Sequence, residues 1–151
     1  SSYLPRTTEF SRGGGKEIAQ IIGGMSSEDE ARYLQTLQNE DPDLYEDVKK
    51  YHLTFIDIIE QFPDGTLRDI MNTVDLSDVS MAMKGVDQEI VDRIIGNLPQ
   101  KKQAMYEPED GPRPKRDVDT ARKKVVDVAR QMEKDGQFNV ADLLGGGEMV
   151  E

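Results

Sequence analysis

The sequence lacks several residue types on which common functions depend. It has no cysteine, which excludes disulfide bonds and thiol chemistry and fits a reducing compartment. Its one histidine, His52, has no partner at metal-ligand spacing, so neither a tight metal site nor a Ser-His-Asp triad is expected. Tryptophan is absent, and there are only five tyrosines and four phenylalanines. An aliphatic core is therefore expected, which is more typical of helices than of sheets.

Positive charge and long apolar runs are also scarce. The chain has 30 acidic and 19 basic residues, a net charge of −11, whose field repels phosphate groups and anionic lipid. Nucleic acid is therefore not expected as a partner. No apolar run approaches the ~20 residues of a membrane span, so no direct membrane insertion is expected. The amino end has no signal-peptide pattern, and its polar start indicates a fragment of a longer chain. The sequence predicts an interaction module that is not an enzyme and needs no cofactor.

The first 52 residues predict a linker and a small helical unit. Residues 1–15 have no apolar periodicity and are predicted to be a flexible linker because they contain Gly13, Gly14 and Gly15. A unit of three short helices is predicted over 16–52. The first helix covers 16–22, the second begins at a capping box of Ser27 and Glu30, and the third follows Asp41-Pro42, a cap and a proline at the first helical position.

The remaining residues predict a larger helical domain over 53–145, followed by a disordered tail over 146–151. Apolar residues recur at spacings of three and four, first at Phe55, Ile58, Ile59 and Phe62. A turn is expected at Pro63-Asp64-Gly65, and helix caps at Asp75, Asp87 and Asn139. A short helix is predicted between Pro99 and Pro108. The longest helix is predicted over 117–135, with an apolar stripe of Val118, Ala121, Val125, Val128 and Met132. No strand is predicted, so the fold class is all-α.

Residues 97–116, NLPQKKQAMYEPEDGPRPKR, are patterned by the sign of charge rather than by apolar spacing. Two lysines open the segment, three acidic residues follow, and a proline-rich basic stretch closes it. Most charge runs are solvated surface, and this segment by itself favours an exposed loop.

Short motifs along the chain occur in the order typical of one family. Residues 74–86, VDLSDVSMAMKGV, and 89–98, EIVDRIIGNL, resemble the segments EVD…LA.ALKGA and ELKEKIFKNM of the bacterial flagellar motor switch protein family FliG. Gly111-Pro112 with 117–121 resembles GPVRLKDVEEAQ, and 132–137 resembles LEEAGE. In the amino half, 14–22 and 39–44 are similar to GGIDTAAEIMNN and ENPELADEI. The resemblance is colinear over nearly the whole chain.

The resemblance implies a fold and a set of partners. The fold would be an armadillo-like three-helix unit joined by a short hinge to a six-helix C-terminal domain, in a right-handed superhelical array. The protein would be a cytoplasmic rotor component in the flagellar basal body, peripheral at the inner face of the cell membrane. Implied partners are other copies of itself through armadillo stacking, the switch protein FliM, the stator protein MotA, and the membrane-ring protein FliF through an N-terminal domain absent from this chain.

The resemblance also assigns roles to individual residues. Stator contact is implied for Lys84 in the family's LKG motif and for Lys101 early in the torque helix. The remaining candidates for this charged ridge are Glu107, Glu109, Asp110, Arg113 and Lys115. The family's hinge motif MFVF aligns with His52, Leu53, Thr54 and Phe55. Exposed ion pairs contribute only about 0–1 kcal/mol each, so such contacts can break and reform as a rotor turns.

Two alternatives stay open at the level of sequence. Pro99 and Pro108 shorten the torque helix, which is also compatible with a FliG-like paralogue that assembles or localises with little torque. The other alternative is a cytosolic superhelical domain of a magnesium transporter of the MgtE type. In that case Glu107, Glu109 and Asp110 would bind Mg²⁺ loosely.

Overall fold

The computed structural model describes residues 14–145, which form helices joined by short connections. No strand occurs in this range, and the predicted all-α class is confirmed. The chain divides into two compact units between Leu53 and Thr54, one residue beyond the predicted boundary. The greater part of the predicted linker, including Gly13, and the predicted tail over 146–151 lie outside the described residues.

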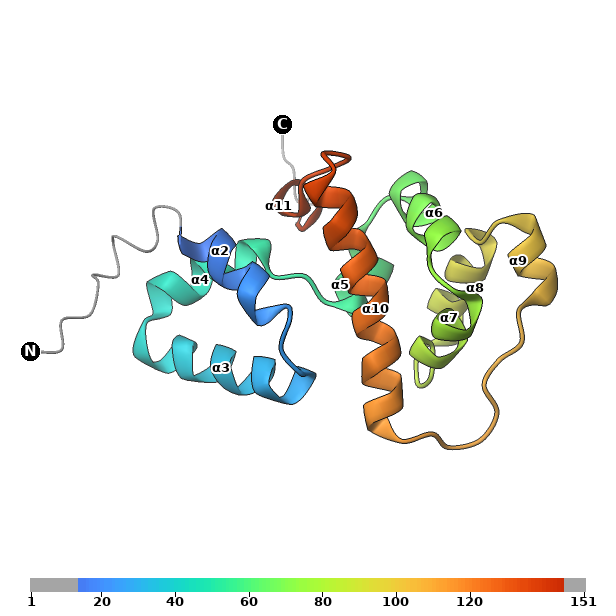
Figure 1. Ribbon diagram of the computed structural model, residues 1–151, viewed down its shortest axis with the longest axis horizontal. Helices are drawn as coiled ribbons and strands as arrows, with labels where there is room; N and C mark the ends of the chain where they lie inside the picture. Colours follow the sequence, from blue (N-terminus) through green and yellow to red (C-terminus); the bar gives the residue numbers. More distant parts are fainter. Residues whose placement is uncertain (1–13, 146–151) are drawn as a thin grey trace, which may run out of the picture. The chain divides into compact units, whose positions relative to one another are not determined.

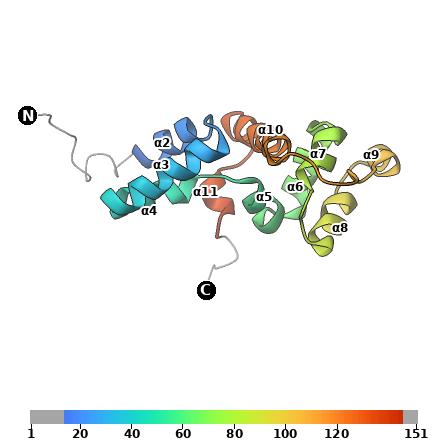
Figure 2. The same cartoon turned by 90° about the horizontal axis from the view of Figure 1, so that it is seen from below.

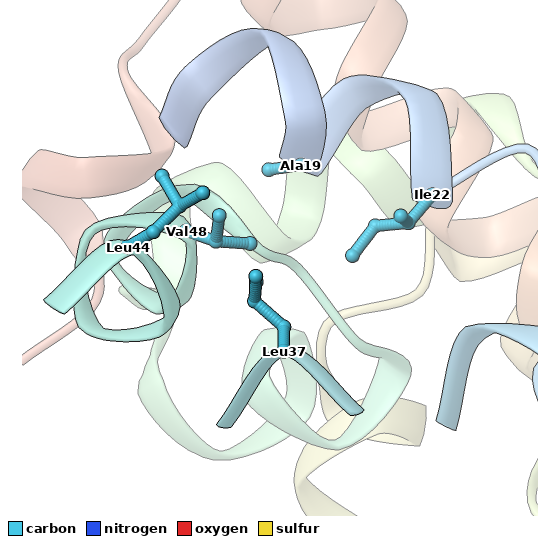
Figure 3. Packing of buried hydrophobic residues seen from close by; sticks show 5 residues of the cluster. All are labelled: Ala19, Ile22, Leu37, Leu44 and Val48. Atoms are coloured by element: carbon cyan, nitrogen blue, oxygen red, sulfur yellow. The ribbon is translucent and has the colours of Figure 1, made fainter. Parts of the chain in front are cut away.

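The first unit contains α2 (Gly14–Ile22), α3 (Ser27–Glu40) and α4 (Pro42–Tyr51), drawn in blue to teal in Figures 1 and 2. All three helices contribute to one apolar cluster, whose side chains point toward one another in Figure 3: Ala19, Ile22, Leu37, Leu44 and Val48. Helices this short are marginal in water when isolated. Burial of each large aliphatic side chain contributes roughly 1.5–3 kcal/mol, so the shared cluster is what stabilises them.

The start of α2 differs from the predicted flexible linker. Gly14 and Gly15 lie in the first turn of the helix, which begins two residues earlier than predicted. A Cβ atom added at Gly15 would lie 2.0 Å from Oδ2 and 3.0 Å from the carbonyl carbon of Asp47 on α4. Gly15 therefore permits a close approach of α2 to α4, and the reason for a glycine here is packing space.

The other two helix starts in this unit give one correction and one confirmation. The N-cap of α3 is Ser26, whose Oγ accepts a hydrogen bond from the Asp29 amide at 3.1 Å. The predicted capping box that starts at Ser27 is therefore wrong by one residue. The predicted cap of α4 is confirmed, because Asp41 accepts from the Leu44 amide at 3.2 Å and Pro42 opens the helix.

The second unit is built around its longest helix. It contains α5 (Phe55–Gln61), α6 (Asp64–Thr73), α7 (Leu76–Ala82), α8 (Gln88–Gly96), α9 (Gln100–Met105), α10 (Lys115–Lys134) and the single turn α11 (Val140–Leu143). Helix α10 packs against α5, α6 and α7 (Figure 1). The predicted apolar face of α5 is confirmed, since Phe55, Ile58, Ile59 and Phe62 are all buried. The Phe62 ring meets Phe138 edge-on, with centroids 5.6 Å apart.

Several details of this unit differ from the prediction. Asp64 and Gly65 belong to the first turn of α6 and not to a separate turn. Helix α9 ends at Met105, three residues before Pro108. On α10 the predicted Ala121, Val125 and Met132 are buried, but Val118 and Val128 are only half-buried. Val126 and Ala129 complete the buried face. Asp75, Asp87 and Asn139 occupy N-cap positions, but none makes a side-chain cap hydrogen bond.

Cations from later helices cap the carboxy ends of earlier ones. Arg93 on α8 donates to the carbonyl oxygens at the end of α5, those of Ile59 and Phe62, both at 2.6 Å. Lys102 on α9 donates to the carbonyl oxygens that end α6, those of Met71 and Asn72 at 3.1 Å and that of Val74. The last carbonyl groups of a helix have no partner within it and carry partial negative charge, so a cation stabilises them.

Arg122 on α10 completes this series at the end of α7. Its guanidinium donates to the carbonyl oxygens of Ala82 and Lys84, both at 2.8 Å, and its Cζ lies 5.2 Å from the centroid of the Phe55 ring. Burial lowers the pKa of Arg122, and the nearby Asp119 carboxylate opposes this shift. Helices α5, α6 and α7 are thus each fixed at one end by the helix three positions later in the chain.

Candidate functional site

The predicted torque helix, α9, buries none of its residues. It is held by polar contacts instead: Lys102 turns inward to cap α6, and Gln103 Nε2 donates to the Leu98 carbonyl at 3.0 Å. Lys101, the neighbouring cation, is exposed, and Met105 is 63% exposed. Of the two adjacent lysines, one therefore attaches the helix and the other faces solvent.

Residues 106–114 connect α9 to α10 and carry most of the predicted ridge (Figure 1). We call residues 101–115 the charged segment. Its exposed charges are Lys101, Glu107, Asp110, Arg113 and Lys115, and Glu109 is half-buried. Within the segment, Arg113 Nε lies 2.8 Å from the Glu109 carboxylate. Both signs of charge are therefore presented to solvent within one short stretch.

The backbone of the charged segment is fastened to α7. Ser80 Oγ donates to the Glu107 carbonyl at 2.9 Å. Lys84, which follows the helix, donates through Nζ to the carbonyl oxygens of Glu109, at 2.9 Å, and Gly111. Gly111 has φ +74°, a backbone conformation that favours glycine and lets the chain turn here. Lys84 is half-buried, and the structure places its ammonium group against the backbone of the segment with which it was predicted to form a ridge.

A cavity of about 230 Å³ lies where the segment leaves α9. It is lined by α7, α8 and the segment, including Met83, Val91, Ile95, Tyr106 and Pro108. Burial raises the pKa of the Tyr106 phenol above its ordinary value. Tyr106 is thus a half-buried residue of the segment, beside the exposed Glu107.

Neither a metal site nor a membrane-spanning helix occurs within residues 14–145. No three histidine, aspartate or glutamate side chains in this range gather where they could hold a metal ion, so Glu107, Glu109 and Asp110 do not converge on one point. Among the helices described, none has the length and apolar character needed to cross a membrane.

The predicted hinge residues are anchored on both sides of the unit boundary. On the first side, the His52 imidazole is buried and hydrogen-bonds through Nε2 to the Glu30 carboxylate on α3. On the second side, Thr54 and Asp57 form a reciprocal capping box at the start of α5, with both bonds at 3.1 Å. The sequence predicts Thr54 only as part of the hinge. The Thr-x-x-Asp spacing was the available signal for its role as a cap.

Together these features define a class: a two-unit, all-helical module whose exposed chemistry is a segment of mixed charge. A family model described as the FliG C-terminal domain matches residues 35–140, and the chain belongs to that family. It is 28% identical to the flagellar motor switch protein FliG of Thermotoga maritima over 152 aligned positions, which cover 98% of this chain and 44% of that protein.

Further relatives agree with this assignment. The chain is 28% identical to the flagellar motor switch protein FliG of Borreliella burgdorferi, over 93% of this chain and 41% of that one. It spans less than half the length of either relative. A crystal structure of FliG residues 86–343 from Helicobacter pylori shares the fold, with a TM-score of 0.57 and 21% identity over 82% of this chain and 59% of that one. These comparisons favour neither the paralogue nor the magnesium-sensing alternative.

Proposed function

We propose that this chain is the carboxy-terminal part of a rotor component in the switch complex of a bacterial flagellar motor. It is not an enzyme: it takes up torque through charge contacts with the stator and contributes to switching of rotation. The family match over residues 35–140 carries this proposal, and the exposed charged segment supports it. The protein works in the cytoplasm, at the inner face of the membrane in the basal body.

The proposed partners divide among the parts of the protein. The charged segment contacts the stator protein MotA. The first unit stacks on neighbouring copies of the protein, as armadillo-like units do, and the switch protein FliM binds the same ring. The membrane-ring protein FliF is contacted through the N-terminal domain of the family.

Charge contacts suit a moving interface. The exposed cations and anions of the segment attract complementary charges over about one Debye length, roughly 8 Å at physiological salt. Such complementarity speeds engagement and selects the partner without deep apolar burial. Each exposed pair contributes only about 0–1 kcal/mol, so no single contact prevents the next step of the rotor.

The joint at residues 52–55 is proposed as the pivot for switching. His52 is tied to the first unit through Glu30, whereas Thr54 and Phe55 begin the second unit. The proposed pivot is therefore the backbone around Leu53, between these two anchors. A change of a few dihedral angles there reorients the charged segment relative to the first unit.

Charge reversal in the native bacterium tests the stator contact. Lys101→Glu is expected to reduce swimming speed while flagella still assemble, and reversal of a complementary charge on the MotA loop is expected to restore speed. Lys134→Glu, an exposed lysine at the far end of α10, is the matched control and should swim normally. Unchanged swimming in Lys101→Glu would remove the stator contact from the proposal.

Rescue of a strain lacking its main switch protein would separate a working rotor protein from a paralogue.

A further inference from the structure

Beyond α9, which Lys102 attaches, the charged segment is held through its backbone. Its fixed points are backbone carbonyl groups: that of Glu107, bound by Ser80, and those of Glu109 and Gly111, bound by Lys84. Between the last two lies Asp110, which is exposed. We call residues 109–111 the acidic turn. The ammonium group of Lys84 links its first and last residues, Glu109 and Gly111.

Most of the hydrogen-bond donors of the Lys84 ammonium group are used by the turn of residues 109–111. An ammonium group has three N–H donors, and two of them are used by the carbonyl oxygens of Glu109 and Gly111. The side chain is half-buried and lines the cavity beneath the segment together with Tyr106. One donor remains, but the Lys84 side chain is half-buried and its ammonium group is bound to the turn, which restricts direct contact with a partner, whereas Lys101 is exposed.

Lys84 is itself fixed through its backbone. Arg122 on α10 donates to the Lys84 carbonyl at 2.8 Å, and the same guanidinium lies over the Phe55 ring at the start of α5. The position of the acidic turn is therefore linked, through Lys84 and Arg122, to the helix that begins the second unit.

We propose that Lys84 is a positioning residue: its ammonium group fixes the Glu109–Gly111 turn and thereby the placement of the segment's exposed carboxylates, and it does not itself bind the stator. This inference rests on the proposed function for its effect on motility. Its structural part, the attachment of the turn, stands independently of any partner.

The attachment is tested on the purified chain by nitrogen-15 NMR relaxation. In the unaltered protein the relaxation of the Lys84 ammonium nitrogen is expected to show restricted motion. The ammonium nitrogen of the exposed Lys101 is the internal reference for unrestricted motion. In Lys84→Met, which keeps the apolar stem, the backbone order parameters of residues 109–111 are expected to fall from about 0.85 to below about 0.6. Lys134→Met, the removal of an exposed lysine at the far end of α10, should leave them unchanged. A Lys84 ammonium as mobile as that of Lys101 would overturn the attachment, even if Lys84→Met failed to fold.

The role in motility is tested with paired charge reversals. Lys84→Glu is expected to impair swimming, and no reversal of charge on the MotA loop should restore it, whereas such a reversal should restore Lys101→Glu. Restoration of Lys84→Glu by a stator reversal would show direct contact and refute the positioning role. If Lys101→Glu swims normally, the proposed stator contact fails, and the NMR result still decides whether Lys84 holds the turn.

Discussion

Loss of the Arg93 cap should destabilise the second unit by an amount that can be estimated from its contacts. Arg93→Met keeps the apolar stem but removes both bonds to the end of α5 and the ion pair with Asp64 at 3.0 Å. Hydrogen bonds to charged groups contribute about 1.5–3 kcal/mol each. The Arg93 side chain is 32% exposed and Asp64 is 61% exposed, so the carbonyl bonds are discounted and the ion pair adds at most about 1 kcal/mol. The expected loss is roughly 2–3 kcal/mol.

Urea unfolding followed by NMR measures this loss in each unit separately. The buried Ile70 reports on the second unit and Val48 on the first. Two variants isolate the cause. Asp64→Asn should cost less than about 1 kcal/mol. Arg68→Met should change stability by less than about 0.5 kcal/mol, because Arg68 is exposed and has no polar partner among residues 14–145. An Arg93→Met variant as stable as Arg68→Met would refute the capping argument, and an Asp64→Asn variant as unstable as Arg93→Met would assign the effect to the ion pair.

Three further predictions concern packing, capping and pH. Gly15→Ala should destabilise the first unit by about 1–2 kcal/mol in urea unfolding, because crowding against Asp47 outweighs the gain in helix propensity. Gly65 is the matched control, because it is also the second residue of a helix but has open space around it, and Gly65→Ala should be neutral or stabilising. Thr54→Ala should cost the second unit about 1 kcal/mol, and normal stability would contradict the capping box. The raised pKa of Tyr106 means that its neutral phenol stabilises the fold fully below the unfolded pKa near 10, and that this contribution is lost as pH rises through the folded pKa. Phenolate absorbance of the native protein minus that of Tyr106→Phe should therefore titrate above pH 10, and a midpoint at 10 would refute the burial effect.

Local patterns predicted the elements of the fold well, because local forces determine them. The spacing of Phe55, Ile58 and Ile59 gave the buried face of α5, and Asp41-Pro42 gave the start of α4. The shift from Ser27 to Ser26 at the cap of α3 has a simple cause: both residues are serines, and either can accept the bond from a nearby amide.

Features that depend on contacts between distant residues could not be read from the sequence. By sequence Gly15 is typical of a linker, whereas in the structure it lies against Asp47, 32 residues later. Lys101 and Lys102 are indistinguishable as neighbours, yet one is exposed and the other caps α6. Lys84 matched a motif read as a stator contact, and only the fold shows its bonds to the turn around Asp110. For each of these residues the partner, and not the residue type, decides the role.

Contact between the charged segment and the stator is proposed to consist of reversible charge interactions. It is tested most directly by the affinity of the purified protein for the cytoplasmic loop of MotA, measured by calorimetry over a series of salt concentrations. We predict that affinity falls steeply between 0.05 M and 0.5 M salt, as the Debye length shortens from above about 10 Å toward a few ångströms, and that Lys101→Glu weakens binding at low salt. Binding that is equally tight at every salt concentration and unaffected by Lys101→Glu would contradict it.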